Sequence, residues 1–157
     1  MKITYIENVR FPSERAHALQ IFHTCQQLVE LGEDITLVTP RREGRQDISH
    51  IFPEAKMRFQ HVLLPCIDAL AWSWIPRSLA YLLQRWTFVE SCMAWKKGRR
   101  SEIWYTRDPY ILDRLAREDE RWIVELHTTL QESLWRRISS RVQRIVVISQ
   151  SLKQWLM

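Results

Sequence analysis

The chain has 157 residues, a hydrophobic fraction of 46% and a formal net charge of +5, which exclude a disordered segment and fit one globular domain. Only three glycines occur, which excludes a glycine-rich phosphate-binding loop and argues against a turn-rich all-β fold. We predict a cytoplasmic protein with reduced thiols, because the three cysteines form no C-x-x-C motif and the sequence shows neither a signal peptide nor a membrane-spanning apolar run. The positive charge favours acidic partners.

Strands and helices are predicted to alternate along the chain. A strand at 3–6 is followed by a helix that begins at the N-cap Ser13, buries Leu19, Phe22 and Cys25 at three-residue steps, and ends at Gly32. The later predicted strands are 34–38, 56–64, 103–105, 122–126 and 145–148, and further helices begin at Pro76, Pro109 and Ser133 and after Ser149. The run 145–148 is continuously apolar, which predicts a strand covered on both faces.

This alternation predicts a three-layer, Rossmann-like α/β domain. Because a β-α-β unit is completed within forty residues, the sheet is expected to be mostly parallel, in the order 3-2-1-4-5-6. That order places the first and fourth strands side by side at the switch point, where ligands of open parallel sheets bind outside the carboxyl ends of the strands.

Polar side chains follow three of the predicted strands. Asn8 and Arg10 follow the first strand, and the loop that contains them either binds a phosphate or acidic acceptor or is an ordinary solvated loop. Arg107 and Asp108 follow the 103–105 strand as a ligand-binding pair or a mutual ion pair, and Asp108 alternatively caps the next helix.

Glu125 and His127 lie two residues apart at the end of a strand, so both side chains point to the same face. The pair either handles a sugar, with the histidine donating or accepting a proton, or is a buried histidine beside a carboxylate. Ser13, His17, Gln20 and Thr24 form a polar stripe along the first helix. Of these, Gln20 and Thr24 are expected to be a solvated surface, and His17 belongs to the site or to that surface with equal weight.

Other chemistry finds little support. His17 and His23 lack metal-ligand spacing, so no metal site is expected. Neither G-x-S-x-G nor G-x-G-x-x-G occurs, and the basic residues form no nucleic-acid-binding motif.

The segment 67–100 combines tryptophans with basic residues. Trp72, Trp74, Trp86 and Trp95 stand near cations such as Arg77, and the helix ends in 96–100 with four cations. This composition fits a helix lying on an anionic membrane surface. The alternative is a core-packing helix with a basic end.

Four segments in the first part of the chain together resemble the opening of family 4 glycosyltransferases: 2–6, 10–17, 28–32 and 35–40. Three later segments match further landmarks of that family in order and spacing: 105–109, 124–127 and 145–149. The resemblance implies a GT-B arrangement, in which two Rossmann-like domains face each other across a cleft. The N-terminal domain mainly binds the acceptor, the C-terminal domain holds the nucleotide-sugar donor, and the sugar is transferred with retention, usually without metal.

By this resemblance, residues 1–157 are the N-terminal, acceptor-side domain, without the C-terminal donor domain and inactive alone. His127 matches the histidine that contacts the transferred sugar, so His127 and Glu125 are the catalytic candidates. The expected cleft-lining residues are Asn8, Arg10, Ser13, His17, Arg107 and Asp108. The chain departs from the family at Arg10, where many members have a Gly-Gly pair, and at Gln150, where an acidic residue often follows the serine.

The implied reaction moves a sugar from a nucleotide-sugar donor to a sugar or lipid-linked acceptor in cell-envelope or polysaccharide synthesis, at the inner face of the membrane. The domain itself needs no cofactor. An alternative from another class is a non-catalytic subunit that binds or recruits a membrane-bound partner, as in transferases split over two chains.

Overall fold

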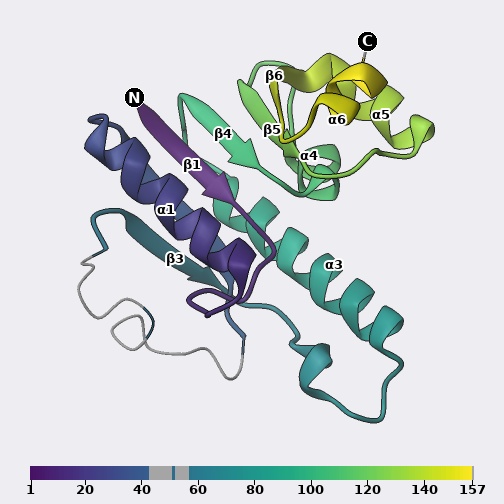
Figure 1. Ribbon diagram of the computed structural model, residues 1–157. Coiled ribbons are helices and arrows are strands. Elements are labelled where there is room, and N and C mark those ends of the chain that lie inside the picture. The colour runs from purple at the N-terminus through teal and green to yellow at the C-terminus, as the bar shows by residue number, and fades with distance from the viewer. Residues whose placement is uncertain (43–50, 52–56, 157) are drawn as a thin grey trace.

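The computed structural model describes residues 1–42, 51 and 57–156 (Figure 1). The strands are β1 (Lys2–Ile6), β2 (Asp34–Pro40), β3 (Gln60–Leu64), β4 (Ile103–Thr106), β5 (Trp122–Leu126) and β6 (Val142–Val147). The helices are α1 (Ala16–Glu30), α3 (Arg77–Lys96), α4 (Pro109–Leu115), α5 (Glu132–Ile138) and α6 (Gln150–Leu156), with short 3₁₀ turns at Ala69–Ala71 and Ser139–Arg141.

The six strands form one parallel sheet in the order β3-β2-β1-β4-β5-β6, which confirms the predicted topology. In the centre of the sheet, Ile3 of β1 pairs with Ile35 of β2 on one side and with Ile103 of β4 on the other. The chain therefore reverses its winding direction between β1 and β4. The carboxyl ends of these two strands define the position where an open parallel sheet binds ligands.

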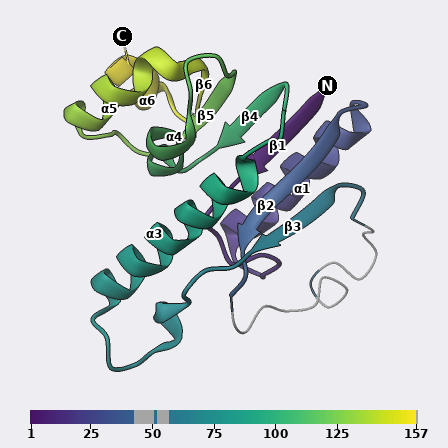
Figure 2. The ribbon, with the colours of Figure 1, turned by 180° about the vertical axis from the view of Figure 1, so that it is seen from behind.

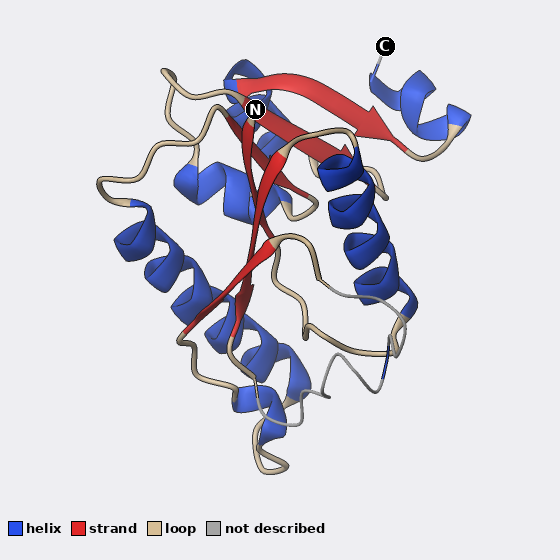
Figure 3. Cartoon of the chain, turned by 90° about the vertical axis from the view of Figure 1, so that its left-hand side faces the viewer, coloured by secondary structure: helices blue, strands red, loops and turns tan. Residues whose placement is uncertain are grey.

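Helices cover both faces of the sheet in three layers (Figures 1 and 3). The helix α1 packs Ile21, Phe22 and Cys25 against one face. The helices α3, α4 and α5 cover the other face, where Phe88, Ile111 and Leu134 join a single core. None of the described helices combines the length and the apolar character needed to cross a bilayer.

Local sequence signals explain several element boundaries. Gly32 ends α1 with a φ of 88°, and the Glu33 N–H donates to the Leu28 carbonyl in the pattern of a Schellman motif. Asp108 caps α4, because its carboxylate accepts a 2.9 Å hydrogen bond from the Tyr110 N–H. The Ser149 hydroxyl likewise accepts from the Leu152 N–H in the first turn of α6.

Three local predictions were wrong. Ser13 does not cap α1, which begins at Ala16 after the N-cap residue Arg15. The third strand begins at Gln60 rather than residue 56; residues 57–59 are not strand, and residue 56 lies outside the described part of the chain. The strand β6 is at the sheet edge and is not covered on both faces, since Val146 is 43% exposed.

Candidate functional site

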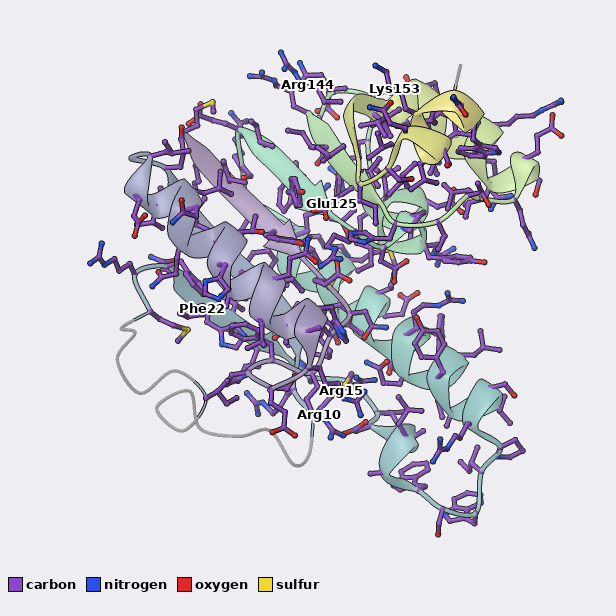
Figure 4. All side chains as sticks on the ribbon, in the orientation of Figure 1. Arg10, Arg15, Phe22, Glu125, Arg144 and Lys153 are labelled. Carbon is purple, nitrogen blue, oxygen red and sulfur yellow. The ribbon has the colours of Figure 1, made fainter. Side chains whose placement is uncertain are left out.

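A cluster of charged and polar side chains lies at the carboxyl ends of β4 and β5. Tyr105 and Arg107 are two residues apart, as are Glu125 and His127, so all four point to the sheet face that α1 covers. The Gln20 side chain reaches the same cluster from α1. Figure 4 places Glu125 beside α1 near the middle of the molecule.

Glu125 stands at the centre of this cluster, and its side chain is only 8% exposed. The Tyr105 hydroxyl donates to Glu125 Oε2 at 2.5 Å. His127 Nε2 lies 2.7 Å from Glu125 Oε1, and Arg107 Nε lies 3.6 Å from the same oxygen. A buried carboxylate is costly unless such donors compensate it, so these three side chains hold the charge in place.

Arg107 contacts both ring nitrogens of His127. Arg107 Nε donates to His127 Nε2 at 2.8 Å, and Arg107 Nη2 lies 3.1 Å from His127 Nδ1. His127 Nε2 also lies against the Glu125 carboxylate. The imidazole is thus oriented by a cation on one side and an anion on the other.

Arg107 also connects the cluster to the switch point. Its backbone N–H donates at 3.0 Å to Oε2 of Glu7, the residue that directly follows β1. Burial of the Glu7 carboxyl and the nearby charge of Asp108 raise the pKa of Glu7 to about 8. Burial also raises the pKa of the Asp108 carboxyl above its usual range. Glu7 is therefore largely protonated at neutral pH, between β1 and β4.

A second group of polar side chains occupies the β1–β2–β3 side of the same edge. The Asn8 amide oxygen accepts a 2.8 Å hydrogen bond from Gln84 of α3. Arg42 Nε lies 3.7 Å from Asp68 Oδ1, and nearby Arg10 contributes to lowering the pKa of Arg42, although burial is the larger cause. Among the described residues, the buried atoms Asn8 Nδ2, Arg10 Nε and Ser13 Oγ have no hydrogen-bond partner.

The helix α1 borders both groups. Figure 4 shows Arg10 and Arg15 near the start of α1, at a distance from Glu125 along the helix. His17 is exposed near the start of α1, and desolvation and the cations Arg107 and Arg15 lower the pKa of its ring. Gln20 accepts from Arg107 Nη2 at 3.3 Å and is therefore part of the cluster.

The predicted site residues thus fall into two sets along one rim. Arg107, Glu125 and His127 are in direct contact, and Arg107 pairs with Glu125 rather than with Asp108, which was one of the two alternatives for Arg107 and Asp108. Asp108 acts as the helix cap. Asn8, Arg10 and Ser13 lie on the other part of the rim and make no contact with His127 among the interactions of the described residues.

Sequence reasoning missed three members of the cluster, Glu7, Gln20 and Tyr105. Glu7 is the first residue after β1 and directly precedes Asn8, and Tyr105 precedes Arg107 by the two-residue step that places both on one face. Gln20 continues the polar stripe from His17 at helical spacing and is exposed as expected, but its side chain also contacts Arg107. Each signal was present, but none distinguishes a buried contact from an exposed one.

The arrangement suits recognition of hydroxyl or anionic groups. Arg107 Nη1 has no hydrogen-bond partner among the described residues and is not fully enclosed, so two N–H groups remain for a ligand. His127 is 28% exposed, so the ring is partly accessible. In the described ranges, no group of three His, Cys, Asp or Glu side chains is placed to hold a metal ion.

Comparison of the sequence with models of protein families and with curated proteins gives no match. Comparison of the structure gives a similar fold in the crystal structure of Arabidopsis thaliana UGT89C1 complexed with UDP, a UDP-glycosyltransferase of GT-B fold, with a TM-score of 0.59 and 10% sequence identity. The match covers 99% of this chain and 47% of the plant protein, so the chain spans about half the length of that protein. At this identity the likeness identifies the fold alone, a Rossmann-like α/β domain.

Proposed function

We propose that this chain is the N-terminal, acceptor-side domain of a retaining glycosyltransferase related to family 4. The observation that carries the proposal is the cluster of Arg107, Glu125 and His127 at the switch point of a Rossmann-like sheet. The likeness to about half of a UDP-glycosyltransferase supports the same conclusion. A second Rossmann-like domain would face this rim and bind the nucleotide-sugar donor.

In this proposal His127 contacts the transferred sugar. Its orientation by Arg107 and Glu125 leaves little rotational freedom, which suits a residue that positions a hydroxyl group. Arg107 Nη1 offers N–H groups to oxygen atoms of the substrate, and Glu125 is a positioning residue that acts through His127. The reaction would serve glycoconjugate synthesis at the inner face of a membrane, with a sugar or lipid-linked acceptor.

The domain by itself should not transfer sugar, because reaction requires donor and acceptor to be held together between two domains. The test is nucleotide-sugar turnover by the protein that contains both domains. We expect His127→Ala to lower kcat about a hundredfold, a loss typical of removing one well-placed hydrogen-bonding group in an active site. Thr128→Ala is the matched control, since Thr128 is the exposed neighbour of His127. Equal turnover of the two variants would contradict the proposal.

A further inference from the structure

An exposed apolar surface lies outside the candidate site, at the start of α3 and in the loop before it. We call it the aromatic tip, and it consists of Ile67, Leu70, Trp72, Trp74, Leu79 and Leu82. Trp74 is 78% exposed, and its ring stacks on that of Trp72 with a centroid distance of 5.7 Å. Figures 1 and 2 show this segment projecting from the body of the molecule. A stacked tryptophan pair in water is unusual unless something covers it.

The helix α3 has two apolar faces, one buried and one exposed. Ala80 and Phe88 face inward and are fully buried in the fold. Leu79, Leu82 and Trp86 recur at three- and four-residue steps on the other side, and all three are exposed. The inward face satisfies the prediction of a core-packing helix. The outward face is left without a cover from the described part of the chain.

The charges near the tip favour an anionic partner. Asp68 is the only acidic residue between positions 66 and 89, and it forms an ion pair with Arg42. Arg77 stands exposed at the first turn of α3, and Arg85 lies over the Tyr110 ring at 3.8 Å. The tip therefore presents tryptophans and leucines beside cations, a composition that binds at the boundary between lipid headgroups and acyl chains.

The basic end of α3 cannot act together with this surface. Because α3 has 20 residues, Arg99 and Arg100 lie about 30 Å from the tip, at the amino ends of the strands. Lys96 is buried there, and it donates to the Leu115 carbonyl at 2.9 Å and pairs with Glu120. The expected single surface over 67–100 is thus divided into a tip with aromatic side chains and a distant basic end.

We propose that the aromatic tip docks on an anionic lipid bilayer and inserts Trp72, Trp74 and Leu79 into the headgroup boundary. On the same half of α3, Gln84 donates to Asn8 at the carboxyl edge of the sheet. Docking through the tip therefore brings the candidate site to the lipid surface. This orientation gives access to an amphiphilic acceptor anchored in the bilayer, a consequence that rests on the proposed function, whereas the docking itself does not.

Co-sedimentation of the chain with vesicles tests the docking without any sugar substrate. We expect binding to vesicles of mixed phosphatidylcholine and phosphatidylglycerol, and much weaker binding to phosphatidylcholine alone. Trp74→Ser should lower the partition coefficient about tenfold, the effect of one large side chain withdrawn from the apolar phase. Leu31→Ser is the matched control, because Leu31 is 76% exposed at the opposite end of the molecule, after α1.

A second pair of variants tests the charge. Arg77→Gln should weaken binding to the anionic vesicles more than Arg100→Gln, which removes an equal charge at the basic end. Absence of binding to anionic vesicles, or equal losses in the tip and control variants, would overturn the proposal. So would a concentration-dependent dimer abolished by Trp74→Ser without any vesicle binding, since the occupant would then be a second copy of the chain. Turnover is not measured in any arm, so these outcomes are independent of the proposed reaction.

Discussion

Glu125 is the residue on which the charged cluster depends, because Tyr105 and His127 form hydrogen bonds with its carboxylate and Arg107 forms an ion pair with it. Removing one partner of a buried ion pair leaves the other charge uncompensated. We expect Glu125→Ala to lower the free energy of unfolding by about 3 kcal/mol, as measured by urea denaturation. Arg107→Ala should cost a similar amount. The double variant should cost less than the sum of the two by about 1 kcal/mol or more.

The exposed pair of Glu132 and Arg136 provides the control for this cycle. Both side chains are largely in solvent, four residues apart on α5. Glu132→Ala should therefore change the free energy of unfolding by less than about 0.5 kcal/mol. If the double variant of Glu125 and Arg107 lost as much free energy of unfolding as the two single variants together, the two charges would not stabilise each other.

Glu7 should make stability depend on pH. Its pKa is about 8 in the folded chain and near 4.5 when unfolded, so the unfolded state loses this proton at lower pH. The contribution of Glu7 is fully present below about pH 4.5 and is lost as the pH rises through about 8. Within that window the free energy of unfolding should fall by about 1.4 kcal/mol per pH unit relative to Glu7→Gln. Urea denaturation of both proteins across this range measures the difference, and a difference independent of pH would contradict the assignment.

The part of the site that backbone geometry determines could be predicted from the sequence, whereas the side-chain contacts could not. Arg107, Glu125 and His127 were found because the ends of neighbouring parallel strands meet at one edge, whatever the side chains do. The partner of each charge was not predictable, since rotamers decide whether Arg107 pairs with Asp108 or with Glu125. The raised pKa of Glu7 could not be anticipated either, because it follows from burial between β1 and β4.

Among the elements, β6 differs most from its prediction. The apolar run 145–148 is typical of a central strand, but β6 is at the sheet edge and Ile148 is 54% exposed. Periodicity cannot separate these cases, because the number of covering helices is a property of the whole fold. By contrast, the strand order was predicted correctly. Local signals also predicted the end of α1 at Gly32 and the starts of α4 and α6 at Pro109 and after Ser149.

Truncating one valine in β5 and one in β6 tests how differently the two strands are covered by helices. Val124 is fully buried between the layers, whereas Val146 is exposed on the open part of β6. We expect Val124→Ala to lower the free energy of unfolding by about 2 kcal/mol through lost burial and a cavity. Val146→Ala should cost less than about 0.5 kcal/mol. Urea denaturation compares the two, and a large loss at Val146 would show that β6 is covered in solution.

For the whole molecule, the sheet joins two apolar cores, which form separate clusters of buried residues in the described part of the chain. Successive residues of β1 point to opposite faces, so Tyr5 enters the α1 core and Ile6 enters the core beneath α3, α4 and α5. Loss of either layer would expose one side of every central strand to water. The two cores should therefore unfold together, as one cooperative transition.

Two cysteines report on these cores separately, because Cys25 of α1 and Cys92 of α3 are fully buried on opposite faces of the sheet. Burial raises the pKa of Cys25 to about 12 and that of Cys92 also upward, so neither thiol reacts while the fold is intact. Pulsed alkylation across a urea series, read by peptide mass spectrometry, should give the same midpoint for both. Cys66 is half-buried at the sheet edge and should react before the transition. Labelling of Cys25 at clearly lower urea than Cys92 would mean that α1 detaches first, and that the sheet does not couple the two cores.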